Sequence, residues 1–159
     1  MRVIRDKKRV LRVLLIEDDP DQAELIIEEV RKVPARIDWD QDVVETEYEL
    51  LERRTKVLAA GYDACVIDGM IQWTHNRPDA PPRPDEVREE GLAGAGIRCA
   101  RSLRDGGFRS PILLYTVLRD EEVKWGDRPP QVEYAEKTDS IEPLVEWLRA
   151  VGRGEARRR

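Results

Sequence analysis

The sequence predicts an α/β protein with a doubly wound, five-stranded parallel sheet covered by helices on both faces. Short apolar runs such as 13–16 and 64–67 do not alternate with polar residues, which is typical of strands buried on both faces. Between these runs, apolar residues recur at helical spacing. Because strand and helix alternate along the chain, a parallel sheet with helical crossovers is favoured.

Composition and charge limit the class of protein further. We interpret the 159 residues as a single domain, 1–159, with a core over about 10–152 and basic tails at both ends. The net charge of −5 argues against a nucleic-acid-binding protein. Cys65 and Cys99 are interpreted as small buried residues, and neither a signal peptide nor an apolar run of about 18 residues is present. We therefore expect a cytoplasmic protein with no membrane span.

The first half of the chain contains three expected strands and two expected helices. In order, they cover residues 10–16 (strand), 20–33 (helix), 36–44 (a weaker strand), 47–60 (helix) and 62–68 (strand). Asp19 is suited to be the N-cap of the first helix, and Pro20 its first residue. Thr46 and Glu49 have the spacing of a capping box at the start of the second helix.

The second half has a long connection before the pattern resumes. Residues 72–90 contain four prolines and few aliphatic residues, so we expect a loop with one helical turn near 85–90. This Pro-rich insert is either a lid or docking segment or a surface loop without order. The remaining elements are expected at 95–104 (helix), 111–116 (strand), 118–125 (a short helical segment at most), 132–137 (strand) and, after Ser140, up to Gly152 (helix).

Carboxylates follow two of the buried strands. Glu17, Asp18 and Asp19 come after the first strand, and Asp68 ends the third. The carboxyl ends of parallel strands meet at one edge of a sheet, where ligands bind. Like charges gathered there need a positive partner, and Mg²⁺ prefers oxygen ligands of this kind. Asp19 is reserved for the helix cap, so Glu17, Asp18 and Asp68 are the candidate metal ligands.

The fourth and fifth strands end at the same edge with Thr116 and Lys137. A hydroxyl and an ammonium beside a cation can position and neutralise a phosphoryl group, which is most of what phosphoryl transfer requires. An aspartate such as Asp68 can itself be the nucleophile. The strand ends therefore predict phosphoryl chemistry.

In these features the chain resembles the receiver domain of two-component response regulators over about 10–152. The matching segments are Leu-Ile-Glu-Asp-Asp-Pro (15–20), Tyr-Asp-Ala-Cys-Val-Ile-Asp (62–68), Pro-Ile-Leu-Leu-Tyr-Thr (111–116) and Tyr-Ala-Glu-Lys (134–137). The resemblance implies a flavodoxin-like, three-layer sandwich. Only twelve residues follow Trp147, too few for a helix-turn-helix domain, so we expect a stand-alone, chemotaxis-regulator-like protein that signals by docking to a downstream protein target, with no specific DNA binding.

The resemblance assigns roles to single residues. Asp68 would be the phosphoacceptor, and Glu17, Asp18, Asp68 and the backbone carbonyl of Met70 would hold Mg²⁺. A sensor histidine kinase or a phosphotransfer protein would donate the phosphoryl group. The protein would assist its own phosphorylation and dephosphorylation and would not otherwise be an enzyme.

The remaining implied roles concern catalysis and switching. Thr116 would be the switch hydroxyl, Lys137 would pair with the phosphoryl group, and Tyr134 would change rotamer on phosphorylation. The chain departs from the family at Thr138 and Gln72, where the family commonly has proline, and in the insert and the shortened 118–125 segment.

Other functions stay open on the sequence alone. A pseudo-receiver would have the same fold and bind partners without phosphorylation. A phosphohydrolase of the haloacid-dehalogenase type needs Asp-x-Asp on the first strand, where this chain has Glu17-Asp18-Asp19. A Toprim-like nucleotidyl-transfer module needs a second aspartate after Asp68, where the chain has Gly69-Met70. His75 is interpreted as a loop residue and not as a metal ligand.

Overall fold

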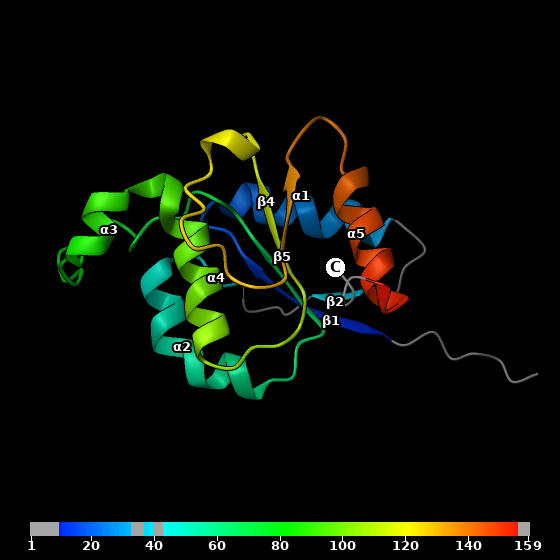
Figure 1. Cartoon of the computed structure of the whole chain (residues 1–159), viewed down its shortest axis with the longest axis horizontal. Helices are drawn as coiled ribbons and strands as arrows, with labels where there is room; N and C mark the ends of the chain where they lie inside the picture. Colours follow the sequence, from blue (N-terminus) through cyan, green and yellow to red (C-terminus); the bar gives the residue numbers. More distant parts are fainter. Residues whose placement is uncertain (1–9, 33–36, 40–42, 156–159) are drawn as a thin grey trace, which may run out of the picture.

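The sheet has five parallel strands in the order β2-β1-β3-β4-β5 among the residues that the structure describes, 10–32, 37–39 and 43–155. The structure is a computed structural model (Figure 1). The strands are β1 (Leu11–Ile16), β2 (Ile37–Trp39), β3 (Ala64–Ile67), β4 (Ile112–Thr116) and β5 (Val132–Glu136). Because the chain moves outward from β1 to β2 and then returns to β3 on its other side, the sheet is doubly wound, as the sequence predicts.

Helices cover both faces of this sheet, which gives a three-layer sandwich. Helices α1 (Pro20–Arg31) and α5 (Glu142–Gly152) lie on one face, and α2 (Glu47–Ala59) and α4 (Ala95–Asp105) lie on the other (Figure 1). Within β1, Val13 packs toward the α1–α5 side and Leu14 toward the α2–α4 side. Helices exclude water from both faces of the sheet, so the residues of β1 are apolar without alternating with polar ones. No helix within the described ranges is long and apolar enough to cross a membrane.

The helix starts follow the predicted caps with one change. Asp19 accepts hydrogen bonds from the first backbone N–H groups of α1, and Thr46 accepts one from the N–H of Glu49 at 3.1 Å. The Glu49 carboxylate, however, accepts from the N–H of Glu45 at 2.8 Å, one residue before the expected partner. The Ser140 hydroxyl accepts the first N–H of α5 at 3.2 Å, although the helix cap itself is the next residue.

The edge strand β2 is shorter than the predicted strand over 36–44. Its described part covers Ile37–Trp39, which pairs with Leu11–Val13 of β1. Val44 makes an isolated parallel bridge to Ile16, so the chain returns to β1 at the end of the predicted range. Residue 36 and residues 40–42 of the prediction lie outside the described residues.

The connection between β4 and β5 has no α-helix. It contains one 3-10 turn, η2 (Asp120–Glu122), as the short predicted segment indicates. Val123 and Trp125 of this connection pack on the core. The Trp125 ring contacts the Arg128 guanidinium, whose carbon lies 4.0 Å from the ring centroid, and it packs edge-to-face with the ring of Tyr134.

The Pro-rich insert is folded against the α2–α4 side. It contains α3 (Asp85–Glu90), which is the predicted helical turn, and it is followed by the 3-10 turn η1 (Leu92–Gly94). Trp73 is buried, its indole N–H donates to the Pro81 carbonyl at 3.1 Å, and its ring lies 5.5 Å from that of Tyr48. The segment is therefore ordered in the structure, and its role as a lid or docking segment stays a prediction.

A buried arginine fixes two turns beside the sheet. Arg104, near the end of α4, donates to the carbonyl oxygens of Phe108, Ser110, Pro130 and Gln131 at 2.7–3.0 Å. Burial lowers the pKa of Arg104 from its ordinary value. The guanidinium thus holds the turn into β4 and the turn into β5 together.

Candidate functional site

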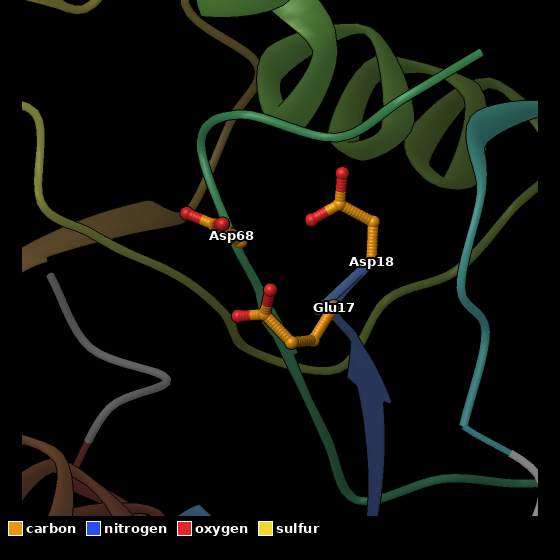
Figure 2. Close-up of side chains that lie close together, drawn as sticks. All are labelled: Glu17, Asp18 and Asp68. Carbon is orange, nitrogen blue, oxygen red and sulfur yellow. The ribbon is translucent and has the colours of Figure 1, made fainter. Parts of the chain in front are cut away.

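Three carboxylates meet where β1 and β3 end. Glu17 and Asp18 follow β1 directly and Asp68 follows β3, and the two strands are neighbours with Ile16 opposite Ile67. Carboxylate oxygens of the three side chains lie within 4.8 Å of one another. Figure 2 shows the side chains leaving these strand ends toward a common space. We call Glu17, Asp18 and Asp68 the acidic triad.

Lys137 reaches the triad from the end of β5. Its Nζ lies 2.7 Å from Oε2 of Glu17 and 3.7 Å from Oδ2 of Asp68. The side chains of Lys137 and Asp68 are about one-tenth exposed and that of Glu17 only 2%. The backbone N–H of Lys137 also donates to the Thr116 carbonyl at 2.7 Å, which fixes the ends of β4 and β5 side by side.

The triad carries more negative charge than Lys137 compensates. Burial and the neighbouring Asp68 carboxylate raise the pKa of Glu17 to about 7, although the Lys137 ammonium opposes the shift. Burial also raises the pKa of Asp68, again against Lys137. Both raised pKa values mean that ionising these two carboxyl groups costs free energy in the folded protein. A cation bound nearby would lower that cost.

The hydrogen bonding of Asp68 indicates which kind of ligand the triad fits. The Oδ1 atom of Asp68 is buried and has no hydrogen-bond partner among the described residues. An ionised carboxylate oxygen without a partner is costly in the interior of a protein. Three carboxylates with an orphaned oxygen form a hard, oxygen-only donor set, which fits Mg²⁺.

Backbone N–H groups bind the other two carboxylates of the triad, those of Asp18 and Glu17. The N–H of Gln72 donates to Oδ2 of Asp18 at 3.0 Å, and the N–H of Asp19 donates to Oε1 of Glu17 at 3.1 Å. The carboxylate of Asp19 caps α1 and is therefore engaged elsewhere, as the sequence indicates. These contacts hold the carboxylates of Glu17 and Asp18 in position.

Thr116 lies against the loop that carries Asp68. Its side chain is fully buried, and its Oγ1 accepts from the N–H of Leu118 at 3.2 Å. A Cβ atom at Gly69 would come within 2.7 Å of this oxygen, so only glycine fits at that position. Met70 follows in the same loop and is half-buried, and the ligand role of its carbonyl stays a prediction.

Tyr134 is not part of the acidic triad. It lies on β5 beside Leu114, is half-buried, and donates its hydroxyl hydrogen to the Leu118 carbonyl at 2.7 Å. The Thr116 hydroxyl and the Tyr134 hydroxyl thus both bind the backbone of Leu118. Its role as a rotamer switch stays a prediction.

Sequence reasoning missed a buried ion pair behind the site. Arg98 of α4 makes a two-pronged contact with Glu47 of α2, at 2.7 and 3.1 Å, and both side chains are 7% exposed. Arg98 also contacts Glu90 at 3.1 Å. The available signal is an arginine within a run of small and apolar residues, 92–100, where a solvated charge is out of place.

The residues set aside on the sequence stay outside the site. His75 is half exposed and contacts Glu45 at 2.7 Å. Cys65 and Cys99 are buried and free, and burial raises the pKa of both thiols.

A groove of about 450 Å³ opens beside the triad. It runs between α1 and the chain after β5, and Lys137 lies in its wall together with Leu25 and Ile141. Leu25 is half exposed.

Comparison with known proteins identifies the fold. No family model matches the sequence, and no curated protein matches it. Solved structures do match: the receiver domain of the Francisella response regulator 1452 has a TM-score of 0.61 and 21% identity, over 91% of this chain and 98% of that domain. The Thermotoga maritima response regulator TrrA, in complex with Mg²⁺-BeF, has a TM-score of 0.59 and 20% identity, over 89% and 99% of the two chains.

A third solved structure agrees. A CheY-like receiver domain from Methylobacillus flagellatus has a TM-score of 0.57 and 18% identity, over 90% of this chain and 99% of that domain. At these identities the comparison establishes the fold. The chain therefore has the fold of a response regulator receiver domain, as its resemblance to that family implied.

Proposed function

We propose that this chain is a phosphorylatable response regulator receiver, with Asp68 as its phosphoacceptor and Mg²⁺ as its cofactor. The observation that carries the proposal is the acidic triad with Lys137 at its rim and the buried, unpartnered Oδ1 of Asp68. Glu17, Asp18 and Asp68 would hold the ion, with the Met70 carbonyl as a further ligand.

Phosphoryl transfer to Asp68 needs little covalent chemistry from the protein. A carboxylate oxygen of Asp68 attacks phosphorus, a new O–P bond forms, and the bond from phosphorus to the donor breaks, so that its electron pair leaves with the donor. Mg²⁺, when bound, neutralises charge on the phosphoryl oxygens. The Lys137 ammonium, 3.7 Å from Asp68, would pair with the same oxygens, and the Thr116 hydroxyl would donate to one of them.

The partners follow from this chemistry. A histidine kinase or a phosphotransfer protein would supply the phosphoryl group. The receiver assists the transfer by positioning its own residues and turns over no other substrate. Its output is docking to a downstream protein.

A pseudo-receiver is the second candidate, and one contact favours it. Glu17 already has a close cationic partner, because Lys137 lies 2.7 Å from it. An ion pair of this kind reduces the need for a metal. The orphaned oxygen of Asp68, which Lys137 does not satisfy, favours the phosphorylatable receiver instead.

Intact-mass measurement after incubation with acetyl phosphate and Mg²⁺ separates the two candidates. We expect the mass of one phosphoryl group on the chain, lost with EDTA and lost in Asp68→Asn. The matched control is Asp79→Asn, since Asp79 is an exposed aspartate of the insert, and it should still be phosphorylated. Phosphorylation that survives Asp68→Asn would assign the acceptor elsewhere, and no phosphorylation of the unmodified chain would favour the pseudo-receiver.

A further inference from the structure

The first residues of the insert are bonded to the acidic triad on one side and to α2 on the other. The N–H of Gln72 donates to Asp18 at 3.0 Å, while the Gln72 carbonyl accepts from the N–H of Glu47 at 3.0 Å. The Trp73 carbonyl accepts from the N–H of Tyr48 at 2.9 Å. The first N–H groups of a helix have no partner within it, so α2 uses the insert to satisfy them.

The same start of α2 carries the buried ion pair. The Glu47 carboxylate takes both prongs of Arg98, and Arg98 in turn donates to Glu90 and to the Gly91 carbonyl, each at 3.1 Å. The space is closely filled, because a Cβ atom at Gly94 would come within 2.9 Å of Arg98. An unbroken series of contacts therefore runs from the triad to the C-terminal end of α3.

Helix α3 depends on these contacts. It has six residues, and no side chain caps its N-terminus. A helix this short is not stable by itself in water. Its anchors within the described residues include Val87, which is buried, and Glu90, which contacts Arg98 and whose carbonyl accepts from Lys124 at 2.9 Å. Figure 1 shows α3 at the edge of the molecule, beyond α2 and α4.

We propose that occupation of the acidic triad is transmitted to α3 through Gln72, Glu47 and Arg98, so that the Pro-rich insert stabilises when the site binds its cation. A cation held at the triad fixes Asp18, which is the acceptor for the Gln72 N–H. Gln72 then holds the first turn of α2, and through Glu47 it holds Arg98 against the end of α3. The inference rests on the metal-binding part of the proposed function.

Hydrogen–deuterium exchange of the whole chain, with EDTA or with Mg²⁺, tests this coupling. We expect Mg²⁺ to slow exchange in peptides covering 72–73 and 85–91 by about fivefold or more, which is the lower end of ordinary coupling between sites. In Glu47→Gln, the effect at 72–73 should remain and the effect at 85–91 should be lost. The matched control is Glu52→Gln, an exposed position of the same helix, which should behave like the unmodified chain.

Glu47 is buried, so its replacement can disturb folding as well as the contact with Arg98. A second pair of variants therefore tests the same contact at a less buried position. Glu90→Gln removes the negative charge from one partner of Arg98 and so weakens that contact, and it should reduce the Mg²⁺ effect at 85–91 more than Glu89→Gln, its exposed neighbour. Mg²⁺ binding is measured by calorimetry on the same samples. Binding with unchanged exchange at 85–91 would overturn the coupling and leave the proposed function standing, whereas absence of binding would overturn both.

Discussion

Glu17 occupies the least favourable position for a negative charge in the site. Its side chain is 2% exposed, Asp68 lies beside it, and Lys137 is its compensating cation. The raised pKa, about 7, means that the folded, metal-free protein holds a proton on Glu17 over a pH range where the unfolded chain has lost it. Ionised Glu17, which a metal would need as a ligand, therefore lowers the stability of the metal-free fold.

This cost predicts how stability depends on pH without metal. A carboxyl group with a raised pKa in the folded state stabilises the fold below the unfolded value of 4.5, and that contribution is lost as pH rises toward 7. We expect the free energy of unfolding, measured by urea titration in EDTA, to fall by about 3 kcal/mol more in the unmodified chain than in Glu17→Gln over this range.

Glu24→Gln on α1 is the control for this comparison, because Glu24 is exposed. Its pH dependence should follow that of the unmodified chain. If Glu17→Gln also followed the unmodified chain, Glu17 would not be the group that titrates near neutral pH. The shift of Asp68 has the same direction, so some pH dependence will persist in the variant.

At the scale of elements, α4 is held by side chains that reach distant segments. Arg104 binds carbonyl groups in the turn that follows its own helix and others 26 and 27 residues away. Loss of the guanidinium would leave several carbonyl oxygens without donors. Each unsatisfied buried group costs about 1–3 kcal/mol.

Replacement of Arg104 should therefore be among the most destabilising changes in the helix. We expect Arg104→Met to lower the free energy of unfolding by about 3 kcal/mol, measured by denaturant titration. Arg101→Met is the control on the same helix, because Arg101 is one-third exposed and its contact with Glu86 is 3.6 Å long. It should change stability by less than about 0.5 kcal/mol. Equal losses of unfolding free energy in the two variants would show that the hydrogen bonds from Arg104 to the carbonyl groups do not contribute to stability beyond what Arg101 contributes.

The elements that the sequence predicts well are those with local signals. The unbroken run 13–16 predicts a strand dry on both faces, and Asp19 and Thr46 predict helix starts, because each signal lies within a few residues of its effect. The pairing of Arg98 with Glu47 joins residues 51 positions apart, and no local pattern indicates it. Likewise, no local pattern indicates the carbonyl contacts of Arg104 or the fold of the insert.

For the whole molecule, the position of the site follows from the order of the strands. The order in which strands are added to the sheet reverses between β1 and β3, because β2 lies on one side of β1 while β3, β4 and β5 follow on the other, and the acidic triad lies at the ends of β1 and β3. Ligands bind at this switch point in open α/β sheets. The convergence of Glu17, Asp18 and Asp68 was therefore predictable once the strands were recognised.

The helices are distributed unevenly around the sheet, as the sequence pattern indicates. The connection between β4 and β5 is reduced to a 3-10 turn, while the connection between β3 and β4 gains α3. The acidic triad contacts the insert through Gln72, which bonds to Asp18 and also to the start of α2. This asymmetry is the whole-molecule basis for expecting the insert to respond to the site.

A crystal structure of the chain with Mg²⁺ and beryllofluoride tests the central claim most directly. The account predicts an ion about 2.0–2.1 Å from oxygens of the acidic triad. It also predicts a beryllofluoride group on Asp68, in contact with Lys137 and Thr116. An empty triad in the presence of both reagents, or a group bound to another carboxylate, would contradict the account.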